Sequence, residues 1–158
     1  MTKTEELAQQ MFSQQDLEEI RRAIADAEKK TSGEIKVDFE YDVQRDPLHH
    51  AHRIFQALGL SKTAEWNATL IVLFLSDRKF AIVGDREIHR RVPPDFWDSL
   101  SAQMETEFRR GDFKNGLLLG IGKLGEKLAN YFPHEKGDRD EISDRIAMSG
   151  DEEDMKGI

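Results

Sequence analysis

The spacing of apolar residues switches along the chain between a helical and a strand period, and these switches predict the order of the elements. Ser13 is a suitable N-cap with Asp16 three residues on, and a helical stripe follows until Gly33. Residues 34–41 alternate strictly between charged and apolar, which predicts a strand with one wet face near a sheet edge. The apolar residues of the helical stripe are Leu17, Ile20, Ile24 and Ala27.

A second helix and a β-hairpin are predicted next. Asp46 is a suitable N-cap for a helix that extends to about Leu58. Residues 69–75 form the most hydrophobic run of the chain and predict a central strand. A polar turn at 76–78 and a second apolar run at 80–83 complete the hairpin.

The following part of the chain predicts a short helical turn near Ile88 and two longer helices. The first spans about 95–110, and the second spans 112 to about 131 and contains four glycines. Because each glycine costs a helix about 1 kcal/mol relative to alanine, they indicate that another backbone packs closely, or that the helix breaks near Gly120. The glycines are Gly116, Gly120, Gly122 and Gly125.

These elements predict an α/β fold. A strand, a helix and a strand favour a parallel pair, and the hairpin adds an antiparallel strand. We therefore expect a three-layer α/β/α sandwich with a small mixed β-sheet and about four main helices. Residues 1–11 are expected to be a flexible lead-in and residues 12–133 a single domain. Residues 134–158 are expected to be a charged, mobile tail, which could carry a short helix near Ile142.

Composition excludes several classes of function. The 158-residue chain has no cysteine, so disulfides and zinc–thiolate sites are excluded. Its net charge of -8 disfavours nucleic-acid binding and is compatible with divalent cations. No apolar stretch approaches a membrane span or a signal core, so we expect a soluble, cytoplasmic protein with no membrane insertion. There is no phosphate-loop motif and no nucleophile elbow, and we expect no nucleotide cofactor.

Several short stretches, taken in order, resemble the TPM-domain family, which is named after a thylakoid lumen protein, a photosystem II repair protein and a receptor modulator. They extend over roughly residues 12–132, and their order and spacing make the resemblance more specific than any one stretch. The matching residues are Phe12-Ser13, Thr31-Ser32-Gly33-Glu34-Ile35, Asn67, Asp77-Arg78, Gly111-Asp112-Phe113 and Gly116-Leu117.

The resemblance implies an α/β/α sandwich. Some members of the family are described as acid phosphatases, and some bind calcium. Many carry a signal peptide and a membrane anchor, and this sequence shows neither pattern. Residues 84–89 also depart from the more glycine-rich segment of the anchored members. The chain therefore resembles the free-standing soluble branch of the family.

The predicted topology gathers three polar residues at one edge of the sheet. Glu34 begins the first strand, Asn67 precedes the second, and Asp85 follows the third. Two carboxylates and an amide oxygen are hard ligands that suit Ca²⁺ or Mg²⁺, and Glu34 and Asn67 also match the family pattern. We predict a metal site there. The alternative is that Glu34 pairs locally and Asn67 completes a turn.

The opposite edge supplies further candidates. Asp77 is the second choice for a metal ligand, and Arg78 is a candidate for binding another group. Alternatively, Asp77 bonds its own backbone in the turn and pairs with Arg78. His89 lies near Asp85 and is either a proton carrier or a surface residue. On the second helix His49 faces outward, and His50 and His52 flank the apolar stripe. Only His49 and His52 could share a metal, and a solvated helix face explains them more simply.

Two functions from different classes follow. The first is a divalent-cation-binding interaction module with a protein partner still to be identified. The second is a metal-assisted phosphatase in which the cation polarises phosphate and bound water attacks. We rank binding above catalysis, because the sequence supplies neither an identifiable nucleophile nor a positively charged phosphate cradle. We expect a monomer or a weak oligomer.

Overall fold

The computed structural model describes residues 1–134 and 142–148. Three of the long helices begin with a side-chain cap, from Ser13, Asp46 and Asp112, and the capping box of Ser13 and Asp16 is present. The elements are α1 (Lys3–Met11), α2 (Gln14–Glu28), β1 (Glu34–Glu40), α3 (Pro47–Ala57), the 3₁₀ helix η1 (Leu60–Lys62), β2 (Ala68–Phe74), β3 (Lys79–Gly84), α4 (Arg86–Arg91), α5 (Phe96–Arg109), α6 (Phe113–Tyr131) and β4 (Ala147–Met148).

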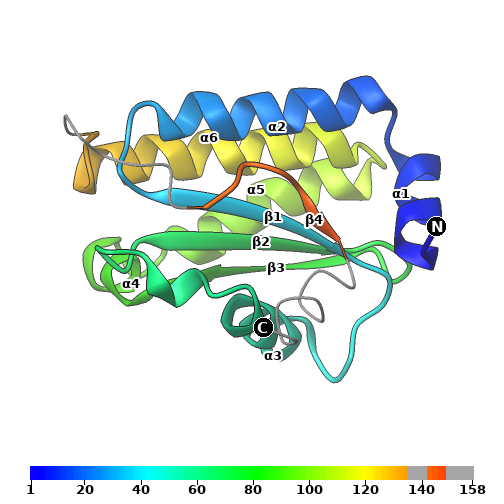
Figure 1. Cartoon of the computed structure of the whole chain (residues 1–158), viewed down its shortest axis with the longest axis horizontal. Helices are drawn as coiled ribbons and strands as arrows, with labels where there is room; N and C mark the ends of the chain where they lie inside the picture. The colour runs from blue at the N-terminus through cyan, green and yellow to red at the C-terminus, as the bar shows by residue number, and fades with distance from the viewer. Residues whose placement is uncertain (135–141, 149–158) are drawn as a thin grey trace.

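The elements form three layers, with a mixed sheet between two layers of helices. In the described residues the strand order is β3-β2-β1-β4, with β1 parallel to both β2 and β4 and with β3 antiparallel to β2. Helices α2, α5 and α6 lie on one side of the sheet and α3 lies on the other (Figure 1). The predicted α/β/α sandwich is confirmed. Its four main helices are α2, α3, α5 and α6, and the short helices α1 and α4 are additional.

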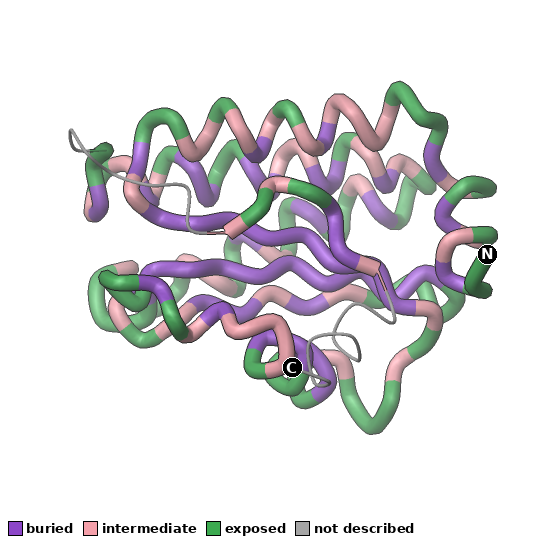
Figure 2. The backbone as a smooth tube through the Cα atoms, in the orientation of Figure 1, coloured by how far each residue is buried: buried purple, intermediate pink, exposed green. Residues whose placement is uncertain are grey.

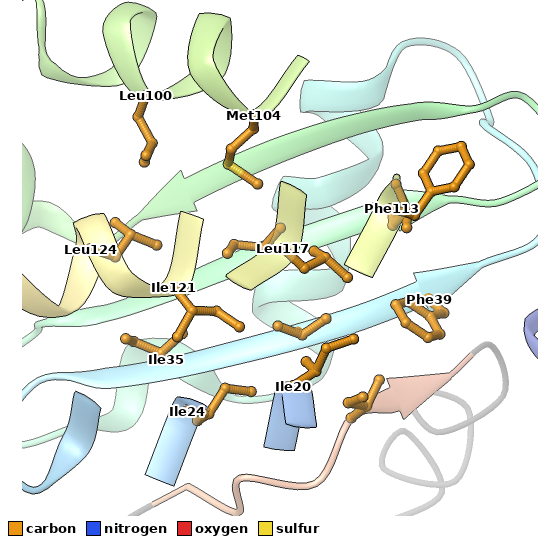
Figure 3. Close-up of a cluster of buried hydrophobic side chains, with 14 of the residues drawn as sticks. Ile20, Ile24, Ile35, Phe39, Leu100, Met104, Phe113, Leu117, Ile121 and Leu124 are labelled. Carbon is orange, nitrogen blue, oxygen red and sulfur yellow. The ribbon is translucent and has the colours of Figure 1, made fainter. Parts of the chain in front are cut away.

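The larger apolar core lies between the sheet and the layer of α2, α5 and α6. Side chains from one face of β1 and β2 meet the inner faces of these helices, so the alternating strand residues and the helical stripes close on one another (Figure 3). Residues labelled there include Ile20, Ile24, Ile35, Phe39, Leu100, Met104, Phe113, Leu117, Ile121 and Leu124.

A smaller apolar core lies under α3, on the other face of the sheet. Ala51, Ile54 and Phe55 of α3 pack there against alternate residues of β2 and β3. Because β1 and β2 are in parallel register, Glu34 pairs with Ala68 and Glu40 with Phe74, so the charged residues of β1 share this face.

β1 lies next to the terminal strand β4, near an edge of the sheet as predicted, but the prediction of one wet face is wrong. β1 is paired on both sides, by β2 and by β4, and all seven of its residues are buried (Figure 2). The alternation itself was interpreted correctly, but solvent does not cover the charged face. Residues 142–148 lie against it, and such distant coverage leaves no local trace in the strand sequence.

Residues 3–11 and 142–148 are more ordered than predicted. Residues 3–11 form a helix and not the flexible lead-in that we expected, because Thr2 caps α1 and Ala8 enters the core beside Leu7 and Met11. In the predicted tail, residues 142–148 carry no helix near Ile142 and end in β4. The rest of that tail, residues 135–141 and 149–158, lies outside the described residues.

Helix α6 is continuous through its glycines, so the alternative of a break near Gly120 is wrong. A Cβ at Gly116 would lie 2.3 Å from Phe108, and one at Gly125 would lie 2.9 Å from the side chain of Ala27. The glycines thus admit side chains of α5 and α2, whereas we expected another backbone. No helix in the described part of the chain is long and apolar enough to span a bilayer.

Candidate metal centre

The backbones of the three predicted ligands meet at one end of the sheet. The N–H of Glu34 donates to the carbonyl of Asn67 at 3.3 Å, and the N–H of Asp85 donates to the carbonyl of Ala68 at 2.9 Å. Ala68 therefore lies between Glu34 on β1 and Asp85 after β3. The sequence correctly placed all three residues at one edge, because each adjoins a strand end that the apolar pattern marks.

Asp85 lies between the end of β3 and the start of α4. Its Oδ1 accepts from the N–H of Arg86 at 2.8 Å, which makes it the N-cap of the helix. Its Oδ2 is inaccessible to solvent and has no hydrogen-bond partner among the described residues. A buried carboxylate oxygen in that condition is costly unless a cation or a donor reaches it.

Glu34 and Asp85 lie on the same face of the sheet. The register pairs Glu34 with Ala68 and Gly84 with Thr69, so Asp85 falls opposite Ala68. The two carboxylates thus flank a methyl group, one strand to each side, roughly 10 Å apart at their backbones. Ala68 itself is fully buried in the smaller core.

Asn67 precedes Ala68, and its side chain has other partners. Its Nδ2 lies 3.3 Å from the hydroxyl of Ser32 and 3.3 Å from the carboxylate of Glu65. Ser32 also donates to Glu65. Asn67 therefore ties the turn before β1 to the loop before β2. This is the turn-completing role that we considered as the alternative.

Charged side chains of both signs lie on α4, beside the site. Arg90 holds the pKa of Glu87 below its ordinary value, chiefly through a hydrogen bond that stabilises the ionised carboxylate. Arg86 lies over the ring of the exposed Trp66 at 4.3 Å, outside this pair. In residues 1–134 and 142–148, no three His, Asp or Glu side chains are grouped to hold a metal ion. A cation bound here would thus need water or carbonyl oxygens as well.

Asp77 and Arg78 lie at the opposite end of the sheet, in the turn between β2 and β3. The Oδ2 of Asp77 accepts from the N–H of Val43 at 2.6 Å, so this carboxylate tethers the loop after β1. Arg78 has a positive φ of 54° and lies 5.7 Å from the ring of Phe113. No ion pair between Asp77 and Arg78 is present in the described residues.

His89 is exposed on α4. Its ring lies 5.2 Å from that of Trp97, in a tilted contact. The side chain thus packs on a neighbouring aromatic ring, which supports the interpretation of a surface residue. Its role as a proton carrier stays a prediction.

Sequence reasoning missed a buried polar row along β1. Lys36 donates to the carbonyls of Ser143 at 3.1 Å and Arg145 at 2.6 Å. Farther along, Nε2 of the buried His50 lies 4.0 Å from the carboxylate of Glu40. The signal for His50 was its position four residues before Ile54, on the buried side of α3.

Comparison with known proteins settles the family. The family model described as the TPM domain matches residues 7–127. The chain belongs to the TPM-domain family. No curated protein matches the chain. Among solved structures, this TPM domain is similar to the BA42 protein of the psychrophilic bacterium Bizionia argentinensis, with 39% sequence identity and a TM-score of 0.81. That match covers 87% of this chain and 94% of the other.

Two more distant structures share the fold alone. The N-terminal domain of a P. gingivalis protein has 18% identity and a TM-score of 0.63, over 79% of this chain and 82% of that one. The N-terminal domain of the cg2496 protein of Corynebacterium glutamicum has 19% identity and a TM-score of 0.59, over 74% of each chain. The TPM match begins inside α1, which agrees with the packing of α1 against the core.

Proposed function

We propose that this TPM domain is a divalent-cation-binding interaction module, and that Glu34, Asn67 and Asp85 hold Ca²⁺ or Mg²⁺. The observation that carries the proposal is the Oδ2 of Asp85, which is inaccessible and has no hydrogen-bond partner in the described residues. A cation would satisfy that oxygen at the position where Glu34 extends from the neighbouring side of Ala68.

The three proposed residues do not fill the coordination sphere of either ion, so water molecules must supply the remaining ligands. Ca²⁺ takes six to eight oxygens, and Mg²⁺ usually keeps several waters, so two carboxylates with bound water suit either ion. Asn67 would contribute its amide oxygen by exchanging its contact with Ser32 or Glu65 for the ion. Asp85 is therefore the ligand on which affinity depends most.

An exposed aromatic residue beside the site supports the interaction part of the proposal. Trp66 is 42% exposed, adjoins Asn67 in sequence and carries the guanidinium of Arg86 over its ring. Tryptophan and arginine are enriched in the contact residues of protein interfaces. A partner protein that covers Trp66 would therefore also contact Arg86, which follows the proposed ligand Asp85. The cytoplasmic location stays a prediction.

The experiment is a titration of the ¹⁵N-labelled protein with Ca²⁺ and then with Mg²⁺, followed by backbone NMR shifts. We expect the largest shifts at residues 34, 67 and 85. Asp85→Asn keeps a good N-cap but removes the charge, and we expect it to weaken the affinity about tenfold or more. The matched control is Asp46→Asn at the N-cap of α3, where affinity should change less than about twofold.

Two results would count against the proposal. One is a set of shifts confined to other regions, with Glu34, Asn67 and Asp85 silent. The other is an equal loss of affinity in the Asp85 and Asp46 variants, which would indicate a diffuse effect of net charge.

A metal-assisted phosphatase ranks below binding. Near the proposed site, Lys36 donates to backbone carbonyls and Arg86 lies over the ring of Trp66. The exposed cations Arg78 and Lys79 lie in the β2–β3 turn, and β3 separates Lys79 from Asp85 by roughly 20 Å. A phosphate held by that turn would not reach a cation at Asp85. Hydrolysis of p-nitrophenyl phosphate that depends on the added metal and disappears in Asp85→Asn would reverse this ranking.

A further inference from the structure

An open hollow lies at the end of the sheet opposite Asp85. Its volume is about 570 Å³, within the range of small-molecule sites. The walls come from the β2–β3 turn, the first residues of β3, the outward side of α5 and Pro47 at the start of α3. Three regions that are distant in sequence therefore converge on it.

The floor of the hollow is aromatic and fixed in place. Phe80 and Phe108 meet edge to face with ring centroids 4.9 Å apart. Phe108 also stacks on Phe113 at 5.6 Å, and it is 8% exposed. Because Phe108 is held from both sides, the floor presents a preformed apolar surface to a ligand.

The rim of the hollow is cationic. Arg78, Lys79 and Arg109 line it, together with the single carboxylate of Glu105. Glu105 is paired with Arg109 at 3.0 Å, whereas Arg78 and Lys79 make no ion pair within the described residues. Two exposed cations thus line the hollow together with its aromatic residues.

The cations are notable because the chain as a whole is acidic, with a net charge of -8. Asp77 is the carboxylate nearest in sequence, and the backbone N–H of Val43 engages it. A local positive patch in an acidic protein attracts anions selectively to that patch.

We propose that this hollow binds an organic anion that joins a carboxylate to an aromatic or apolar group. The carboxylate pairs with Arg78 and Lys79, and the apolar group lies on Phe80 and Phe108. A carboxylate suits this place better than a phosphate dianion, because its single charge costs less to bring beside an apolar floor.

Two sources supply this chemistry: a free aromatic or aliphatic acid, and the C-terminal residue of a peptide that ends in phenylalanine. The site is independent of the cation proposal, because the two regions lie at opposite ends of β3.

The first experiment titrates the full-length, ¹⁵N-labelled protein with phenylacetate, with acetyl-Gly-Gly-Phe and with its C-terminal amide. We expect shifts at residues 78–80, 101 and 109, saturating with phenylacetate or with the free-acid peptide. Tighter binding of the peptide would identify a peptide C-terminus as the source, and tighter binding of phenylacetate a free acid. Equal binding of the amidated peptide, or tighter binding of phenyl phosphate than of phenylacetate, would overturn the proposal.

The second experiment removes the positive charges of Arg78 and Lys79. The double variant Arg78→Asn and Lys79→Gln keeps a residue that tolerates the positive φ at position 78, and it should weaken binding about tenfold or more. The matched control is Lys123→Gln with Lys127→Gln, which removes the same charge from the groove between α5 and α6. Binding should change less than about twofold in that control. A similar loss in both double variants would contradict the assignment, provided that their melting temperatures match the parent's.

Discussion

The two faces of β1 are buried to the same depth but differ in chemistry. Ile35, Val37 and Phe39 face the core formed with α2 and α6, where burial itself is favourable. The opposite face carries four charged residues: Glu34, Lys36, Asp38 and Glu40. Charged groups are tolerated at such depth when partners are supplied, as the carbonyls of Ser143 and Arg145 do for Lys36. Stability therefore resides mainly on the first face, and the proposed cation site lies on the second.

The largest effect is expected from Phe39→Ala, on the apolar face. Phe39 is 0% exposed, and its ring stacks on Phe12 at 5.0 Å. Deleting the ring leaves a cavity between β1 and the chain entering α2, and the free energy of unfolding should fall by about 3–5 kcal/mol. Urea denaturation followed by circular dichroism measures this loss.

Leu48→Ala is the control for that change, because Leu48 is exposed at the start of α3. Its free energy of unfolding should stay within about 0.5 kcal/mol of the parent value. A loss below about 2 kcal/mol in Phe39→Ala would contradict the close packing of the apolar face.

An intermediate effect is expected from Lys36→Met, on the polar face. Methionine keeps the apolar stem but removes the ammonium, so the carbonyls of Ser143 and Arg145 lose their donor. We expect a loss of about 1–3 kcal/mol, together with faster amide hydrogen exchange at residues 146–148.

Lys79→Met is the matched control, because Lys79 is exposed at the start of β3. Neither stability nor exchange at 146–148 should change measurably in it. Unaltered exchange in Lys36→Met would show that Lys36 does not hold the last described segment against β1.

The smallest effects, of opposite sign, are expected from two glycines of α6. In Gly116→Ala the new methyl group meets Phe108, which Phe80 and Phe113 hold in place, so stability should fall by about 1–2 kcal/mol. In Gly122→Ala no atom lies within 4 Å of the new methyl group, so the free energy of unfolding should rise by about 0.5–1 kcal/mol. Thermal melts of the two variants measure both changes. A gain in both would mean that α6 does not pack closely against α5.

The order of the main elements was predictable, because each is encoded locally. Ser13 and Asp46 cap the helices that they were expected to cap, and Gly59 and Gly111 adopt positive φ where the helices end. The hairpin of β2 and β3 followed from two apolar runs around a polar turn. The position of β1 inside the sheet was not predictable, since its second neighbour, β4, comes more than 100 residues later.

The location of the candidate site was predictable from the sequence, but the contacts of its side chains were not. Strand ends marked by Glu34, Asn67 and Asp85 were expected at one edge, and their backbones do meet there. The partners of Asn67 depend on side-chain directions that the strand pattern does not encode. The cationic hollow was missed for a similar reason, because Arg109 and Phe108 reach it from another helix.

The sequence alone determined the helices, the hairpin, the α/β class and the resemblance to the TPM domain, because caps, periodicity and turns act over a few residues. Tertiary structure decided that β1 is internal, that α1 joins the core, and that Asp85 keeps a buried oxygen without a partner in the described residues. These features depend on contacts between segments distant in sequence. Whether a charged side chain is buried depends on the segments that pack over it, and the neighbouring residues in the sequence do not indicate which segments these are.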